Sequence, residues 1–324
     1  MAGWLGICIG AVSIALALNI GANNSAAEMG PAYGSGVRSR REAVALIAVF
    51  CVAGAVLAGQ RVMGTMGHGL TEGDVLAANP TGLLIAVIPM LALLGLANLL
   101  RIPISSSRVV VGAVVGLGLF YGAANIALIG VVIAWWIITP LLALVSSYLL
   151  GRFLYPRLVT WTGALRSEEA VRRTLAWAVT VSGCWMAFSA GSNNLANSMG
   201  PAVEAGVFSA GSGAVIGGAA MACGALLLGG RLIKTVGKEI ASICPVCAIL
   251  VQMVSASIVF TASLYGMPVS LAEIVTCSVI GFGSAANGFR DTARNQHVRR
   301  IVVLWPAAPV AAGAIAFALQ AAVR

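Results

Sequence analysis

Long apolar runs without charged residues alternate with short charged segments along the whole chain. A helix that crosses the hydrocarbon core of a membrane needs about 20 predominantly apolar residues. The run 109–151 is long enough for two such helices, so the pattern predicts about ten crossings, and in all an all-α integral membrane protein of about 10–12 transmembrane helices, some of them broken or re-entrant. The uncharged runs are 1–27, 43–60, 75–100, 109–151, 174–203, 205–230, 240–272, 274–289 and 301–323.

The composition excludes a water-soluble protein. Of the 324 residues, 60% are hydrophobic and 9% are charged, against about 25% charged residues in an ordinary soluble domain. The mean hydropathy is +0.98, which leaves too little polar surface to cover a soluble globule, whereas lipid needs almost none. The net charge of +9 is better explained by basic cytoplasmic loops than by a nucleic-acid partner, and we expect no such partner.

The basic residues agree with the ten crossings. Sixteen of the 19 Lys and Arg residues fall in five groups, and with an external N-terminus all five groups lie on the same side, as the positive-inside bias requires. We therefore expect a multi-pass protein of the cell (plasma or inner) membrane with both termini extracytoplasmic. The groups are Arg38, Arg40 and Arg41; Arg101; Arg152, Arg157, Arg166, Arg172 and Arg173; Arg231, Lys234 and Lys238; and Arg290, Arg294, Arg299 and Arg300.

The N-terminus and the cysteines carry little functional signal. The first apolar run lacks a basic region and a cleavage site, which is typical of a first span rather than a signal peptide. The seven cysteines lie in apolar stretches and are expected to be small buried side chains rather than a disulfide framework. Cys244 and Cys247 have the CxxC spacing, but no second pair completes a zinc site, so we expect no metal and no cofactor; a redox role is the less favoured alternative.

The chain contains an internal repeat. At an offset of 170, GANNSAAEMGP (21–31) aligns with GSNNLANSMGP (191–201), and 18 of 50 aligned pairs are identical; Pro103-Ile-Ser105 also matches Pro268-Val-Ser270 at an offset of 165. The copies are 1–151 and 174–324, joined by a basic cytoplasmic linker, 152–173. Because each copy holds five crossings, the copies face opposite ways. Inverted repeats are typical of secondary transporters, whose substrate site lies near mid-membrane where the copies meet.

Asparagines recur at matching positions beside a Gly-Pro pair in each copy. Proline cannot continue a helix interior and glycine weakens it, which predicts a matched pair of broken helices over 21–36 and 191–206. The freed amides and side chains there can face a solute; close helix packing is the alternative, but paired asparagines in both copies favour a site. The candidate residues are Asn23, Asn24, Asn193, Asn194 and Asn197.

A proline followed by serine begins a second motif in each copy. The first copy has Ser105, Ser106, Ser107 and Arg108, and the second has Ser270. This pattern marks a helix start, whose unpaired N–H groups and positive dipole end bind oxyanions. Ordinary helix capping is the alternative, with more weight at Ser270 than at the triple serine.

These segments resemble the inorganic phosphate transporter (PiT) family, which has two inverted copies of a signature like GANDVANAxGTxVGS and, later in each copy, a PxSTTH-like segment. The match covers nearly the whole chain. It includes Gly34-Ser-Gly36 and the stretch from Arg231 to Lys238. The resemblance implies an anion transporter and a homodimer in which part of each protomer moves relative to a scaffold.

The chain differs from the sodium-coupled phosphate members at the residues expected to bind cations. Their signatures have Asp at the fourth position, where this chain has Asn24 and Asn194; Arg108 and Glu273 replace the histidine of PxSTTH, and Gln252 lies where the family often carries Glu. The GANN form resembles the sulfate permease branch of the family.

The substitutions favour sulfate and protons over phosphate and sodium. Sodium binds best to carboxylates, and both signature positions carry asparagine instead. Sulfate only accepts hydrogen bonds, so it suits a site that is rich in donors. Importing a dianion against a negative interior requires co-transported cations, because each charge costs about 2.3 kcal/mol per 100 mV. Ionisable groups within spans are functional candidates, and we favour Glu28 and Glu273 as proton carriers; pairing of Glu273 with Arg108 is an equal alternative.

The sequence thus predicts a secondary active transporter that imports inorganic sulfate by proton symport. The alternative is an inorganic phosphate transporter coupled to H⁺ or Na⁺. A channel-forming subunit and an intramembrane enzyme are less favoured, the enzyme because the sequence has neither a His-rich cluster nor paired Asp in its spans. His68 and His297 are expected in loops without a role. The expected partners are sulfate or phosphate, protons, the lipid bilayer and a second copy of the chain.

Overall fold

The computed structural model describes residues 3–100, 105–164, 167–229, 244–288 and 296–323. These residues are almost entirely helical, and the single extended pairing among them is a bridge between Thr71 and Ala124, so the predicted all-α membrane fold is confirmed. The helices are α1 (Trp4–Gly34), α2 (Arg40–Ala58), α3 (Gln60–Gly64), α4 (Val75–Ala78), α5 (Pro80–Leu100), α6 (Ser106–Phe120), α7 (Ile126–Leu149), α8 (Tyr155–Gly163), α9 (Glu168–Glu204), α10 (Ala210–Gly224), α12 (Pro245–Leu264), α13 (Leu271–Asn287) and α15 (Gln296–Val323), with π-helical turns η1 (Thr65–Gly69), η2 (Leu150–Leu154) and η3 (Ala225–Gly229).

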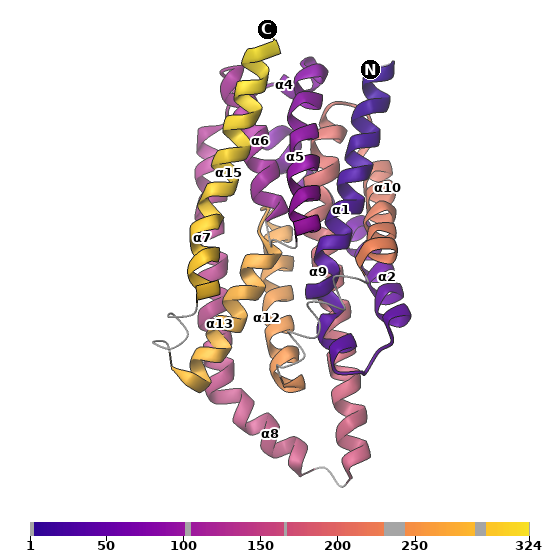
Figure 1. Ribbon diagram of the computed structural model, residues 1–324, viewed down its shortest axis with the longest axis vertical. Coiled ribbons are helices and arrows are strands. Elements are labelled where there is room, and N and C mark those ends of the chain that lie inside the picture. Colours follow the sequence, from indigo (N-terminus) through magenta and orange to yellow (C-terminus); the bar gives the residue numbers. More distant parts are fainter. Residues whose placement is uncertain (1–2, 101–104, 165–166, 230–243, 289–295, 324) are drawn as a thin grey trace.

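Six helical segments of the described chain are long and apolar enough to cross a membrane. Four shorter or more polar helices complete the bundle: α9 has 37 residues but carries the asparagine-rich segment, and α5, α6 and α13 include shorter apolar stretches. Both chain ends lie at the same end of the molecule (Figure 1). The six are α1, α2, α7 with its continuation through α8, α10 with η3, α12, and the Pro306–Val323 part of α15.

Two pairs of helices turn back within the molecule. In Figure 1, α5 and α6 both occupy the half that holds the chain ends, whereas α12 and α13 both occupy the opposite half, and α6 and α13 begin near the middle. This differs from ten complete crossings, because hydropathy alone does not distinguish a helix that spans the membrane from one that enters and returns. Re-entrant pairs of this kind place helix ends inside the protein, where irregular backbone is tolerated.

The broken helices predicted over 21–36 and 191–206 are wrong. α1 runs unbroken to Gly34 and α9 to Glu204, with Pro31 and Pro201 in their last turns. A proline frees the carbonyl four residues before it. In α1 that carbonyl belongs to Ala27, and it accepts a hydrogen bond from the side chain of Gln252 at 3.3 Å. A distant side chain thus supplies a donor to the carbonyl that Pro31 leaves free.

Glycines bring four helices into backbone contact. A Cβ atom on Gly21 in α1 would overlap the backbone of Met221 in α10, and a Cβ atom on Gly191 in α9 would overlap the backbone of Cys51 in α2. The two contacts occupy matching positions in the two sequence copies, because an offset of 170 relates Gly21 to Gly191 and Cys51 to Met221. The same offset relates the contact of Gly54 with Phe188 to that of Gly224 with Leu18.

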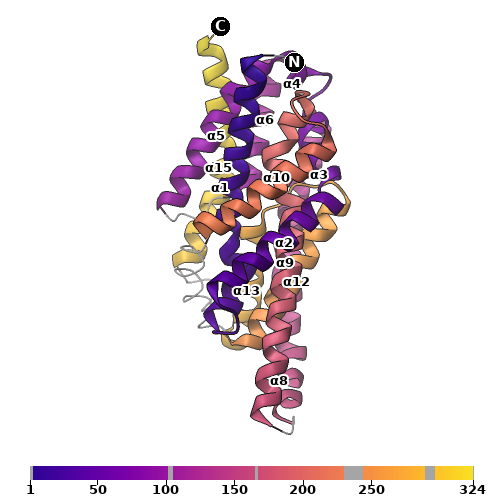
Figure 2. The ribbon, with the colours of Figure 1, turned by 90° about the vertical axis from the view of Figure 1, so that its right-hand side faces the viewer.

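The directions of α1 and α9 agree with an inverted arrangement. α1 begins at the end that holds both termini, whereas α9 begins at the opposite end beside α8, so the two helices run in opposite directions (Figures 1 and 2). Together with the glycine contacts this supports the inverted repeat. The repeat and its boundaries at 151 and 174 remain predictions.

The structure corrects the expectations for two cysteines and two histidines. Cys244 and Cys247 form a disulfide, because their i, i+3 spacing at the start of α12 brings the two side chains together. His68 lies in η1, where its Nδ1 is 2.6 Å from Oε1 of Glu204, and His297 lies in α15. Neither histidine is in a loop.

We predict that Gly21→Ala and Gly191→Ala each lower the free energy of unfolding by about 1–3 kcal/mol, because the added methyl group has to push two backbones apart. Thermal unfolding of the purified protein in detergent measures the effect. Gly130→Ala in α7 is the matched control, since no atom lies within 4 Å of its added Cβ, and it should leave stability unchanged or raise it slightly. Equal unfolding temperatures for all three variants would contradict the close contacts.

Candidate functional site

A small polar cavity lies where the starts of α6 and α13 meet α1 and α9. Its volume is about 10 Å³, close to the minimum that holds one water molecule. Seven of its nine lining residues are substrate-site candidates from the sequence, so the fold brings together side chains that lie up to 247 positions apart. The lining consists of Asn23, Asn24, Ser105, Ser106, Ser107, Asn194, Ser270, Leu271 and Ala272.

Two helix starts face each other at this cavity. The Ser105 hydroxyl caps α6 by accepting a hydrogen bond from the Arg108 N–H at 3.3 Å, and the Ser270 hydroxyl caps α13 by accepting from the Glu273 N–H at 3.4 Å. Both serines therefore perform ordinary capping. The first N–H groups of an α-helix have no partner within the helix, and the positive ends of both helix dipoles point to the same place. The cavity therefore lies at two helix starts whose serine caps leave further backbone N–H donors without a partner in the helix.

Two asparagines at matching positions supply further donors. Asn24 is 8% exposed and Asn194 is 1% exposed, and in the described part of the chain the Nδ2 atom of neither has a hydrogen-bond partner. A buried polar group without a partner costs about 1–3 kcal/mol. These two amides therefore present unused donors to the cavity.

Of the three remaining asparagine candidates, Asn23 lines the cavity, and Asn193 and Asn197 have structural contacts. Asn197 Nδ2 donates to Ser107 Oγ at 3.0 Å and to Asn194 Oδ1 at 3.4 Å, so it positions residues that line the cavity. Asn193 lies outside the cavity lining. It donates to the carbonyl of Met267 at 3.0 Å and accepts from the N–H of Val269 at 3.1 Å, which holds the turn between α12 and α13 in place.

Arg108 and Glu273 form a buried ion pair next to the cavity. Arg108 Nη2 lies 2.5 Å from Glu273 Oε2, with side chains 9% and 1% exposed. The Arg108 guanidinium also lies 4.9 Å from the centre of the Trp136 ring, whose Nε1 donates to the Pro268 carbonyl at 2.9 Å. Neither charged residue lines the cavity. The pair joins the first turns of α6 and α13. The alternative prediction that Arg108 and Glu273 pair with each other is therefore confirmed.

Glu28 lies on α1 one turn beyond Asn24, is 1% exposed, and its Oε2 has no hydrogen-bond partner among the described residues. Its main-chain carbonyl accepts from Gln252 Nε2 at 2.8 Å, and Gln252 Oε1 accepts from Ser182 Oγ at 2.8 Å. The sequence predicted a role for Glu28 because it is an ionisable residue within a predicted span. It did not predict the contacts of Ser182 and Trp136, because a single serine or tryptophan in an apolar run indicates no more than packing.

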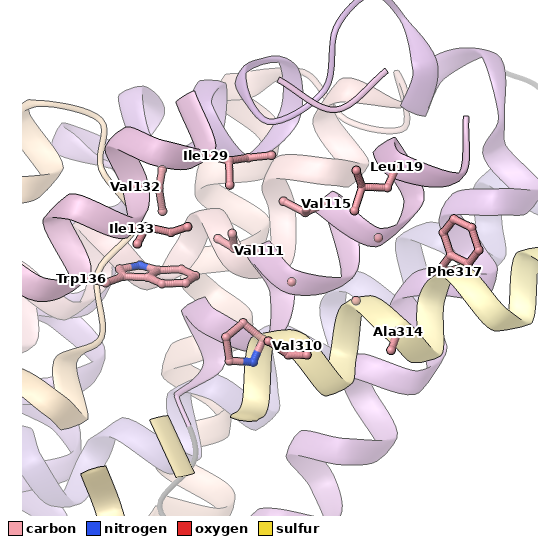
Figure 3. A pocket seen from close by; sticks show the side chains of 14 residues that line it. Val111, Val115, Leu119, Ile129, Val132, Ile133, Trp136, Val310, Ala314 and Phe317 are labelled. Atoms are coloured by element: carbon pink, nitrogen blue, oxygen red, sulfur yellow. The ribbon is translucent and has the colours of Figure 1, made fainter. Parts of the chain in front are cut away.

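A much larger cavity of about 550 Å³ lies between α6, α7 and α15. Figure 3 shows its lining of aliphatic and aromatic side chains, among them Val111, Ile133 and Phe317. An oxyanion there would lose its hydration without gaining donors. The small polar cavity is therefore the candidate site for an anion.

Three comparisons connect the chain to known proteins. Residues 20–316 match the phosphate transporter family. The chain is 37% identical to the sulfate permease CysP of Bacillus subtilis (strain 168) over 95% of this chain and 85% of that protein. It is 25% identical to the chloroplastic inorganic phosphate transporter 2-1 of Arabidopsis thaliana, over 90% of this chain and 67% of that protein.

The fold also has a solved counterpart. A sodium-dependent phosphate transporter superposes with a TM-score of 0.81 at 20% sequence identity, covering 98% of this chain and 99% of that chain. At this identity the likeness concerns the fold alone. With the family match over residues 20–316 and the identity to the sulfate permease, it follows that this chain is a multi-pass membrane protein that belongs to the phosphate transporter family.

Proposed function

We propose that the protein is a secondary active transporter that imports inorganic sulfate by proton symport. One observation carries the proposal: Asn24 and Asn194, which occupy matching positions, direct unused amide donors at a cavity that also receives two helix starts. The described residues that line this cavity include no carboxylate. An acceptor-only dianion fits such a donor set.

Phosphate is the alternative substrate, and the protonation state of the anion separates the two. At neutral pH phosphate retains a proton that needs an acceptor, whereas sulfate offers only acceptors. The unpartnered atoms on the cavity-lining asparagines are donors, which favours sulfate. The name of the Bacillus subtilis relative also points to sulfate, while the Arabidopsis thaliana relative is named for phosphate.

The size of the cavity is consistent with alternating access. A volume of about 10 Å³ is too small for a tetrahedral oxyanion, so the starts of α6 and α13 have to separate before one can enter. Two contacts now join these starts: the hydrogen bond from Ser107 Oγ to the Val269 carbonyl at 2.8 Å and the Arg108–Glu273 ion pair. A closed site between two such elements is the arrangement expected of an inverted-repeat transporter.

Glu28 is our preferred proton carrier. A carboxylate buried without a partner is costly in its charged form, and the ion pairs of the described residues do not include Glu28. It lies about 6 Å along α1 from Asn24, close enough for its charge to influence the anion. Glu273 remains a second candidate, but its contact with Arg108 supports a structural role. We further propose a homodimer in the plasma or inner membrane, with both termini extracytoplasmic.

Uptake into proteoliposomes tests substrate and coupling ion together. We expect labelled sulfate to accumulate when the outside is acidic, without a requirement for sodium, and labelled phosphate to be taken up far less. Asn24→Asp or Asn194→Asp should raise the KM for sulfate about tenfold or more, because each places a negative charge beside the dianion. Asn125→Asp is the matched control, since Asn125 caps α7 outside the cavity lining and aspartate caps equally well.

Three outcomes would overturn this assignment. Preferential uptake of phosphate would favour the alternative substrate. Uptake that ignores both proton and sodium gradients would indicate a channel. Unchanged sulfate affinity in both Asn→Asp variants would remove the cavity from the transport path.

Glu28→Gln should abolish accumulation driven by a pH gradient while sulfate exchange across the membrane continues. Glutamine resembles the protonated carboxyl but cannot release a proton. Accumulation under an acid-outside gradient, compared with counterflow of labelled sulfate at equal pH, gives the measurement. Glu42→Gln is the control, because Glu42 caps α2 outside the cavity lining. Persistence of gradient-driven accumulation in Glu28→Gln would assign the proton to another group.

Glu273→Gln should destabilise the protein by about 3–5 kcal/mol, because it leaves Arg108 buried without its counter-charge. Removing both charges in Arg108→Met/Glu273→Gln should restore part of that loss. Thermal unfolding in detergent measures both variants. A Glu273→Gln protein that unfolds like the wild type but loses coupling to the pH gradient would instead identify Glu273 as a proton carrier.

A further inference from the structure

A groove between α2 and α9 combines a basic end with an apolar floor. Its volume is about 770 Å³, and it opens on the outer surface, where Trp177 is 61% exposed and Val181 is 57% exposed. Arg38 lies at one end, and Phe50 and Phe188 line the other part. The small polar cavity between α6 and α13 shares no residue with it.

The basic end is held in a defined geometry. Arg38 Nε donates to Thr180 Oγ1 at 3.0 Å, and its guanidinium lies 5.5 Å from the centre of the Trp177 ring. Arg173 lies one turn before Trp177 on α9 and is 74% exposed at its side chain. Two glutamates lie beside these arginines: Arg38 Nη1 is 3.6 Å from Oε1 of Glu42, which also lines the groove, and Arg173 Nη2 is 3.9 Å from Oε1 of Glu169. The segment 38–42 still holds three arginines against one glutamate. This end of the groove therefore carries net positive charge.

The apolar part has the length of one leaflet. From Trp177 to Phe188, α9 rises about 16 Å, about half of the 30 Å hydrocarbon core of a bilayer. Tryptophan is enriched at membrane–water interfaces, which places Trp177 at the headgroup level and Phe188 near the centre. A ligand that fills this groove has an anionic head and an apolar tail.

We propose that the groove binds an anionic phospholipid, with its phosphate at Arg38 and Arg173 and one acyl chain along α2 and α9. Basic pockets between membrane helices recognise such headgroups. A second copy of the chain fits less well, because a two-fold interface at this face sets the same arginines against each other. The bound lipid would brace α9, the helix that carries Asn194.

Native mass spectrometry of the purified protein with added phosphatidylglycerol or phosphatidylcholine tests the proposal. We expect phosphatidylglycerol to be retained preferentially. Arg173→Gln should weaken its binding about fivefold, the value of one arginine near an anionic headgroup. Ala45→Trp, which fills the groove without changing the charge, should remove the bound lipid. Arg157→Gln is the control, because it removes the same charge from α8, which contributes no described residue to the groove, whereas Arg173 lies on α9 one turn before the groove residue Trp177.

Unfolding temperatures distinguish a variant that no longer binds the lipid from a variant that is less well folded. Phosphatidylglycerol should raise the unfolding temperature of the wild type and of Arg157→Gln but not that of Ala45→Trp, while all three unfold alike in phosphatidylcholine. Equal retention of the two lipids, or an equal effect of Arg157→Gln and Arg173→Gln, would overturn the proposal. So would a dimer that dissociates in Ala45→Trp, because a second copy would then occupy the groove.

Discussion

Polar groups at the centre of this protein are buried away from bulk water, and that constraint decides which of them hold the structure and which form the site. Unsatisfied hydrogen-bonding groups in such surroundings are costly. Asn193 and Trp136 use their hydrogen-bonding groups on main-chain partners at the turn before α13. Asn24 and Asn194 do not. Their Nδ2 donors are left without a partner on two residues that line the cavity, and a ligand that supplies an acceptor there would remove this cost.

The same constraint explains how two helices can begin inside the protein. A buried helix start leaves N–H groups without partners, and Ser105 and Ser270 satisfy one each at helix starts that line the cavity. The opposite charges of Arg108 and Glu273, one from each helix, meet directly behind these caps. The ion pair joins the two starts together with the hydrogen bond from Ser107 Oγ to the Val269 carbonyl. The geometry of the cavity therefore depends on contacts between the start of α6 and the segment that leads into α13.

The sequence predicted the composition of the site better than the shape of its helices. The repeat and the serine motifs identified seven of the nine cavity residues, because matching positions in two copies carry more information than one. Asn193 and Asn194 are adjacent and chemically identical, yet they point about 100° apart on α9, so only the fold separates the structural one from the lining one. The carbonyl that Pro31 frees in α1 accepts a hydrogen bond from Gln252, which lies 225 positions away in the sequence. No local pattern reveals that compensation.

A neutral donor set also suits a site that has to release its ligand. Arg108 lies behind the cavity, but Glu273 balances its charge, so a dianion would meet amides, hydroxyls and helix starts rather than a free cation. A full positive charge in a site of low polarity would hold a dianion strongly, and transport would then stall at release. On the proposed function, protonation of Glu28 would remove a negative charge one turn from Asn24 when the anion binds, and loss of that proton would help to expel it. The described lining has no carboxylate, and the carboxyl group of Glu28 lies one turn along α1 from it. On the proposed function these are two parts of the same electrostatic arrangement.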